Sequence, residues 1–140
     1  MNPLENFESY HIRKILQELK TIGIDIMGEN IPRIIEETSF DRRSQNHPDE
    51  CPYYKTGKPC VSDVLDFNCF LCACPEFDSK KDEGGCRINH PLGKWHYPYL
   101  HSASGRVWDC SDCSIPHFPV YVEQYLIQNL EKLKKMQDEV

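Results

Sequence analysis

Eight cysteines confined to one stretch are the feature that most constrains how this 140-residue chain can fold. All eight lie between positions 51 and 113, where glycine and proline are frequent and aliphatic side chains are sparse. Hydrophobic residues make up only 39% of the chain, and the aliphatic ones gather at its two ends. Burial of apolar surface alone is therefore too weak to order the middle, which needs covalent or metal cross-links. The residues are Cys51, Cys60, Cys69, Cys72, Cys74, Cys86, Cys110 and Cys113.

The N-terminal sequence favours reduced thiols. Glu5, Glu8 and Arg13 interrupt the first apolar pattern, so we expect no secretory signal. No run approaches the roughly 18–20 apolar residues of a membrane span. These features predict a cytoplasmic protein whose thiols stay reduced and free to bind metal. A disulfide scaffold, a thioredoxin-like redox pair and scattered buried thiols are the weaker alternatives, since neither a signal nor a βαβ pattern accompanies the cysteines.

Two pairs with the spacing Cys-x-x-Cys, Cys69 with Cys72 and Cys110 with Cys113, indicate metal knuckles. A tight turn between two cysteines lets both sulfur atoms reach one ion while backbone amides stay free to hydrogen-bond them. The simplest grouping joins the two pairs into one four-thiolate site and leaves a second set, Cys51, Cys60, Cys74 and Cys86. An interleaved grouping fits equally well, because the segment between the pairs is longer than the roughly 15–20 residues common in zinc ribbons.

The identity of the metal stays open, between zinc at two sites and a 4Fe-4S cluster. Cys72 and Cys74 are one residue apart, so in an extended chain both sulfurs point the same way and could bridge neighbouring sites. The run ending at Pro75 is similar to ferredoxin ligand runs but does not match their spacing. His117 follows Cys113 by four residues and is the remaining candidate, as a ligand or as a donor to a thiolate. We expect His11 at a helix surface.

The charge distribution argues against nucleic acid as a partner. The net charge is −6, and eight thiolates with two zinc ions would bring it to about −10. The basic residues alternate with acidic ones, so no basic face is expected to attract phosphates. The aromatic segment 95–99 could stack on bases, so a zinc-knuckle nucleic-acid binder is kept as a second alternative. Packing of these aromatics over the metal loops, or a ligand-binding surface, are the other interpretations.

The remaining patterns predict a small α+β fold with a metal-stabilised, loop-rich core between two helical ends. Residues 1–45 form the N-terminal helical segment, with an apolar stripe at Ile12, Ile15, Leu16, Leu19 and Ile22. Pro32 fits the first turn of a shorter helix, and the polar tract 41–48 looks like a linker. Residues 46–118 form the cysteine-rich module, with brief strands around 106–108. Residues 119–140 form an amphipathic helix that opens at Pro119 and reaches about Met136. We expect the three parts to make one compact domain.

Five short motifs carry a resemblance to a known family. They are Cys51-Pro-Tyr-Tyr, Gly57-Lys-Pro-Cys60, Asn68-Cys-Phe-Leu-Cys-Ala-Cys-Pro75, Gly84-Gly-Cys86 and Asp109-Cys-Ser-Asp-Cys-Ser-Ile-Pro-His117. Together they resemble the cysteine-rich small domain family, also described as zinc-finger-like, over about half of the chain. One departure is that the two glycines precede Cys86 and follow a charged insert.

The resemblance implies a metal-binding domain whose relatives stand alone or are fused to cobamide-biosynthesis enzymes, including a pyridoxal-phosphate-dependent threonine-phosphate decarboxylase. We recognise no catalytic motif in the chain. The sequence therefore predicts a noncatalytic metal-binding module, structural or regulatory, that is accessory to a metabolic enzyme. An iron–sulfur redox or catalytic protein is the alternative.

Overall fold

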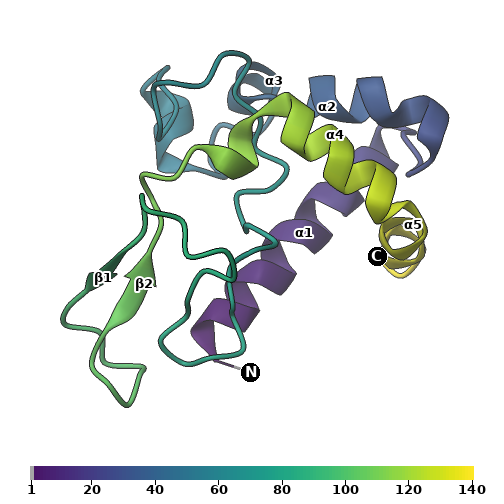
Figure 1. Ribbon diagram of the computed structural model, residues 1–140. Coiled ribbons are helices and arrows are strands. Elements are labelled where there is room, and N and C mark those ends of the chain that lie inside the picture. The colour runs from purple at the N-terminus through teal and green to yellow at the C-terminus, as the bar shows by residue number, and fades with distance from the viewer. Residues whose placement is uncertain (1) are drawn as a thin grey trace.

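A computed structural model describes residues 2–140 as a small α+β fold (Figure 1). The described chain has five α-helices: α1 Pro3–Thr21, α2 Ile31–Glu37, α3 Phe40–Asn46, α4 Pro119–Gln128 and α5 Leu130–Asp138. One antiparallel hairpin joins β1 Lys94–His96 to β2 Val107–Asp109 and projects away from the helices. None of the helices in residues 2–140 is both long and apolar enough to cross a membrane.

Helix α1 begins with a capping box. The Asn2 side chain accepts a hydrogen bond from the Glu5 backbone N–H, and the Glu5 carboxylate accepts one from the Asn2 N–H. These bonds satisfy two donors that would otherwise have no partner in the first turn. The predicted apolar stripe is buried at three positions, Ile15, Leu16 and Leu19. Ile22 was predicted on the same stripe but is 53% exposed, because the helix has already ended there.

The polar tract 41–48 is largely helical, so the prediction of a linker is wrong over most of it. Ser39 caps α3 by accepting a hydrogen bond from the Arg42 backbone N–H. Phe40 and Arg43 turn inward from this helix and are buried. The tract looked like a linker because Arg43, a charged residue, is one of the two inward-facing side chains.

The predicted C-terminal helix is divided into two at Asn129, whose backbone leaves the helical region at φ −120° and ψ 21°. The Asn129 side chain and its backbone N–H both donate to the Tyr125 carbonyl. Such side-chain competition with the helical ladder is a known cause of helix interruption. The break lets α4 pack on α2 while α5 packs on α1 (Figure 1).

One buried cluster unites the helices of both chain ends. It also contains Phe70 and Leu71, which come from the cysteine-rich segment. A second, aromatic cluster contains Phe40, Tyr54 and Phe67 together with Cys69. The cysteine-rich segment is therefore anchored to the helices at one place, around residues 67–71. The helical cluster consists of Ile15, Leu16, Leu19, Ile24, Ile26, Ile31, Ile34, Phe70, Leu71, Val122, Leu126 and Leu133.

Gln137 is a buried polar side chain that ties α5 to the loop after α1. It accepts from the Ile26 N–H at 2.9 Å and donates to the carbonyls of Ile24 at 2.9 Å and Leu16 at 3.3 Å. Gln137→Leu is expected to lower the free energy of unfolding by about 2–3 kcal/mol, because three buried backbone groups lose their partner. Urea denaturation measures this loss. The exposed Gln124→Leu is the control and should change stability by less than about 0.5 kcal/mol.

The predicted strand around 106–108 is confirmed within one residue. It forms β2, in register with β1 so that Trp95 lies opposite Trp108 and the two rings pack edge to face. The Arg106 guanidinium lies 3.6 Å from the centre of the Trp95 ring. The backbone N–H of Trp108 donates to the Glu83 carbonyl at 2.8 Å and so links the hairpin to the loop before Cys86.

Candidate metal centre

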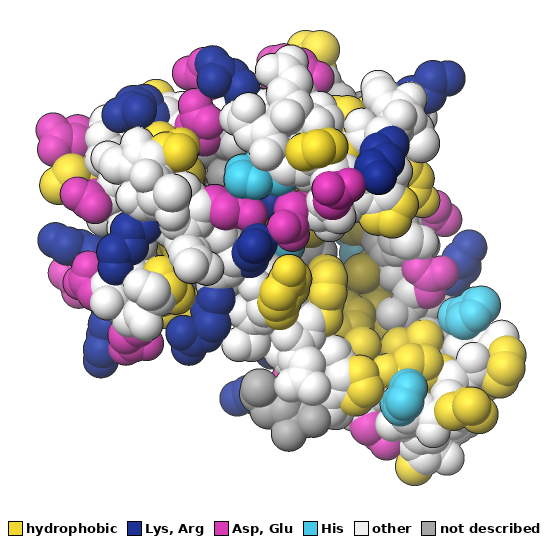
Figure 2. Space-filling view, turned by 180° about the vertical axis from the view of Figure 1, so that it is seen from behind, with side chains coloured by type: hydrophobic (Ala, Val, Ile, Leu, Met, Phe, Trp, Pro, Cys, Tyr) yellow, Lys and Arg dark blue, Asp and Glu magenta, His cyan; other side chains and the backbone are white. Residues whose placement is uncertain are grey.

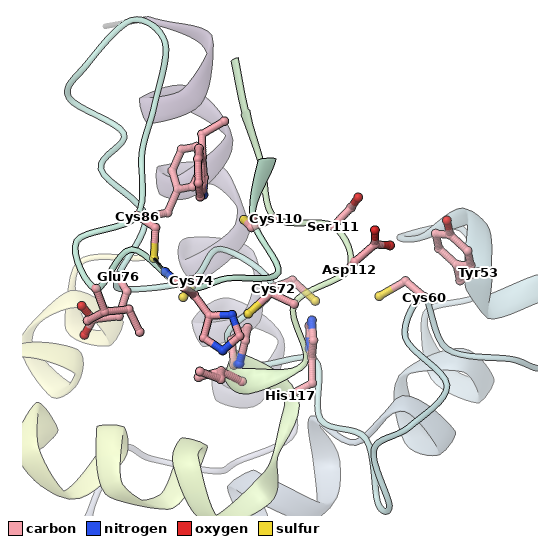
Figure 3. A pocket seen from close by; sticks show the side chains of 18 of the residues that line it. Tyr53, Cys60, Cys72, Cys74, Glu76, Cys86, Cys110, Ser111, Asp112 and His117 are labelled. Atoms are coloured by element: carbon pink, nitrogen blue, oxygen red, sulfur yellow. Dashed lines mark hydrogen bonds between the residues drawn. The ribbon is translucent and has the colours of Figure 1, made fainter. Parts of the chain in front are cut away.

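Most of the cysteines line a single pocket with a volume of about 320 Å³ (Figure 3). On the face shown in Figure 2, hydrophobic side chains, the class that includes cysteine there, gather in a hollow, and acidic and basic side chains are interspersed over much of the remaining surface. All eight cysteines are free thiols. The seven that line the pocket are Cys51, Cys60, Cys72, Cys74, Cys86, Cys110 and Cys113.

Four thiols form what we call the first cysteine group: Cys51, Cys60, Cys69 and Cys72. The interaction of its thiol with that of Cys69, desolvation, and the charges of Cys69, Cys60 and Cys51 raise the pKa of Cys72. Burial and the charges of Cys69 and Cys51 likewise raise the pKa of Cys60. Each thiol of this group thus lies within electrostatic reach of the others.

Backbone pairing positions the first group against the helices. The Cys69 N–H donates to the Thr38 carbonyl at 2.8 Å, where α2 ends. Next to it, the fully buried Asn68 side chain accepts from the Phe70 N–H at 2.8 Å and so shapes the turn. Cys51 precedes a short 3₁₀ turn, Pro52–Lys55, which packs on α3. Residues far apart in sequence are therefore held on one side of the pocket.

The other four thiols form the second cysteine group: Cys74, Cys86, Cys110 and Cys113. Burial and the charges of the other three thiols raise the pKa of Cys74 to about 11. Burial and the charges of Cys113, Asp109 and Cys86 raise the pKa of Cys110 to about 11. Figure 3 shows Cys74 and Cys86 on the side of the pocket away from Cys60. Cys72 lies between these two cysteines and Cys60.

Two local turns assemble the second group. An antiparallel bridge pairs Phe77 with Cys86 and brings Cys86 back toward Cys74. Cys110 follows β2 directly, and the Cys113 N–H donates to the Cys110 carbonyl at 2.9 Å, which closes the predicted knuckle. The Asp109 carboxylate accepts from the Ser111 N–H at 2.9 Å and stabilises the same turn.

Gly84 is required where the chain turns toward Cys86. Its backbone has a φ of +72°, a conformation that side chains other than glycine rarely adopt. A Cβ atom at this position would lie 2.5 Å from the Phe77 ring, which allows no substitution without movement. The two glycines before Cys86 thus form a tight turn that reverses the chain direction.

These groups differ from the simplest grouping suggested by the sequence, because each knuckle belongs to a different group. Cys69 and Cys72 are held by the helices, whereas Cys110 and Cys113 are held by the hairpin. In the part of the chain that the structure describes, no three Cys, His, Asp or Glu side chains converge closely enough to hold an ion. Each group is therefore a set of neighbouring thiols whose sulfur atoms must draw closer to share a metal.

His117 lies at the pocket wall and is 6% exposed. Its Nδ1 is 2.9 Å from the Asn68 carbonyl, and its ring stacks on Phe67 with centroids 4.1 Å apart. A carbonyl only accepts, so Nδ1 carries the proton and Nε2 keeps a free lone pair. Burial lowers the pKa of His117, so the ring is neutral at pH 7. This tautomer suits a metal ligand and does not suit a donor to a thiolate through Nε2.

Two residues of the site were missed by the sequence analysis. Tyr54 lies in the same buried cluster as Cys69, and Arg43 donates through Nε to the Tyr54 hydroxyl at 3.0 Å. The sequence signal for Tyr54 is its place in the motif Cys51-Pro-Tyr-Tyr, three residues after Cys51. His11 was expected at a helix surface, but its Nε2 lies 3.1 Å from the Phe70 carbonyl and burial lowers its pKa to about 4.

Comparison of the chain with protein-family models, with curated proteins and with solved structures finds no match.

Proposed function

We propose that this protein is a noncatalytic metal-binding module with two thiolate centres. The first centre is formed by Cys51, Cys60, Cys69 and Cys72, and the second by Cys74, Cys86, Cys110 and Cys113. The observation that carries the proposal is that seven of the eight free thiols line one pocket, and that the pKa of Cys72 responds to Cys51, Cys60 and Cys69 whereas that of Cys74 responds to Cys86, Cys110 and Cys113. Four thiolates are the full ligand set of a tetrahedral zinc site.

The electrostatic environment of the metal-free thiols favours the binding of a cation. Desolvation raises the pKa of Cys60 and Cys74, and the interaction with Cys69 together with desolvation raises that of Cys72; the charges of neighbouring thiols raise all three further, because adjacent negative charges repel one another. A divalent cation removes this repulsion and releases the thiol protons on binding. Zinc is favoured because each group contains four sulfur ligands, the complete set of a tetrahedral site, and His117 is then a neighbour of the thiols and not a fifth ligand. An iron–sulfur protein is the alternative class.

A saturated four-thiolate centre leaves no coordination position for a substrate, which favours a structural or regulatory role over catalysis. The resemblance of residues 51–117 to the cysteine-rich small domain family supports a metabolic enzyme as the partner, with cobamide biosynthesis as the candidate pathway. The mixed surface charge in Figure 2 gives no added support to a nucleic-acid partner.

Metal analysis of protein purified without oxygen tests the proposal. We expect two zinc ions per chain and no visible absorption. Cys60→Ser and Cys86→Ser should each reduce the zinc content by about one ion per chain. Cys60→Ser removes a ligand from the first group, and Cys86→Ser removes one from the second. The double variant should retain none.

Iron with acid-labile sulfide and visible absorption would assign the alternative, an iron–sulfur protein. A wild-type protein that binds no metal under reducing conditions would overturn both the zinc proposal and the iron–sulfur alternative. Loss of both zinc ions in each single variant would show that the eight thiols form one shared centre instead of two.

A further inference from the structure

A second cavity lies between α1 and the helices α4 and α5, and we call it the helical groove. Its volume is about 580 Å³, within the roughly 300–1,000 Å³ of small-molecule sites. One stretch of the cysteine-rich segment forms a wall between the two cavities. Leu71, Ala73 and Pro75 line the groove, whereas Cys72 and Cys74 line the metal pocket. Successive side chains thus alternate between the cavities, and metal held by the thiols leaves the groove open.

Three charged side chains that line the helical groove have no partner. Within residues 2–140, the carboxylates of Glu8 and Glu76 and the ammonium of Lys132 form neither an ion pair nor a hydrogen bond. The three come from α1, from the cysteine-rich segment and from α5. Figure 3 shows the Glu76 carboxylate turned away from the labelled cysteines. The groove therefore presents two free negative charges and one free positive charge from three separate walls.

The other ionisable side chains of the helical groove do not change this balance. Arg87 donates to the Pro75 carbonyl at 2.7 Å, and its Nη2 lies 3.8 Å from the Asp78 carboxylate. Burial lowers the pKa of His11 to about 4, so its ring is neutral at pH 7. A ligand that matches the groove must therefore complement an excess of one negative charge.

The uncharged lining adds hydrogen-bond donors and an apolar surface. Tyr121 and Tyr125 of α4 line the groove, and their hydroxyls make no hydrogen bond within the described residues 2–140. Burial and the charge of Glu8 raise the pKa of Tyr125, so this hydroxyl keeps its proton and can donate. Their rings can also face an ammonium group. Ile12 and Met136 provide contacts for an aliphatic chain.

We propose that the helical groove binds a small basic amino acid, an ion with two ammonium groups and one carboxylate, of which lysine is the type. The two ammonium groups match Glu8 and Glu76, and the carboxylate matches Lys132. Lys132 repels a simple cation, and the two carboxylates repel a simple anion. An ion that carries both signs pairs with all three side chains. The site is separate from the thiols, and the proposal goes beyond the proposed function.

NMR titration of the ¹⁵N-labelled protein with L-lysine tests this proposal. Three analogues each lack one charged group: cadaverine lacks the carboxylate, 6-aminohexanoate the α-ammonium, and L-norleucine the side-chain ammonium. L-lysine should shift the amide signals of α1 and α4 that border the groove. Each analogue should bind about tenfold more weakly, because a hydrogen bond between charged groups contributes about that factor.

Variants identify the side chain that meets each group. Lys132→Gln should weaken the binding of L-lysine about tenfold without weakening that of cadaverine, which has no carboxylate to lose its partner. Glu8→Gln should weaken both. Lys134→Gln and Glu123→Gln remove the same charges from exposed positions outside the groove and should change neither.

Three results would overturn the proposal. They are no amide shifts at about 10 mM L-lysine, equal affinities for L-lysine and cadaverine, or equal losses in Lys132→Gln and Lys134→Gln. The zinc content of the same samples tests the proposed function separately, so the failure of one proposal is distinguishable from the failure of the other.

Discussion

Removal of metal from the reduced protein is expected to abolish the order of residues 72–113 while the helices remain folded. Between positions 72 and 113, all of which the structure describes, no hydrophobic side chain is buried. The helical cluster, in contrast, buries twelve hydrophobic residues, ten of them outside the cysteine-rich segment. In small zinc-dependent folds, zinc binding contributes about 10–16 kcal/mol to the free energy of folding. Apolar burial within residues 72–113 cannot replace a contribution of this size.

Hydrogen exchange read by mass spectrometry measures this effect. After treatment with a chelator and a thiol reductant, peptides from 72–113 should lose protection, including the Trp108 amide that bonds to Glu83. Peptides from α1 and α4 should keep theirs, and added zinc should restore the whole pattern. Cys86→Ser with zinc is the matched control and should deprotect the hairpin without affecting the first group. Unchanged protection of 72–113 in metal-free protein would contradict the prediction.

The periodic parts of the chain were the predictable ones. The stripe of α1 and the C-terminal stripe were expected from apolar spacing, and Leu16, Val122 and Leu126 are fully buried. The division at Asn129 escaped prediction because the apolar spacing continues across it to Leu133. Helix α3 escaped prediction because its inward face includes Arg43, which is buried through its bonds to Glu18 and Tyr54.

The composition of each cysteine group could not be predicted from spacing. It depends on backbone bonds between distant segments, such as that from Cys69 to Thr38 and the bridge of Phe77 with Cys86. Sequence spacing limits only how close two cysteines can come, and it does not choose between partners that loops of similar length can reach. The contact of Tyr54 with Cys69 likewise exists only once α3 and the turn after Cys51 are packed together.

Phe70 links the two halves of this architecture, and Phe70→Ala is expected to lower the free energy of unfolding by about 3–5 kcal/mol. Phe70 is flanked by the predicted ligands Cys69 and Cys72, yet its side chain is 0% exposed within the helical cluster. Its removal leaves a cavity among the helices and loosens the knuckle from which Cys69 and Cys72 extend.

Because metal affinity includes the free energy needed to order the ligands, Phe70→Ala should weaken the first cysteine group together with the helices. The second group is positioned by the Phe77–Cys86 bridge and by the turn after β2, away from the helical cluster, and should be less affected. Urea denaturation of the zinc-loaded protein and cobalt titration in the Cys86→Ser and Cys60→Ser backgrounds measure the two effects. Phe7→Ala is the control: this ring is 55% exposed on α1, and its removal should change stability by less than about 1 kcal/mol. A loss for Phe70→Ala no larger than that for Phe7→Ala would contradict the anchoring of the thiols to the helical cluster.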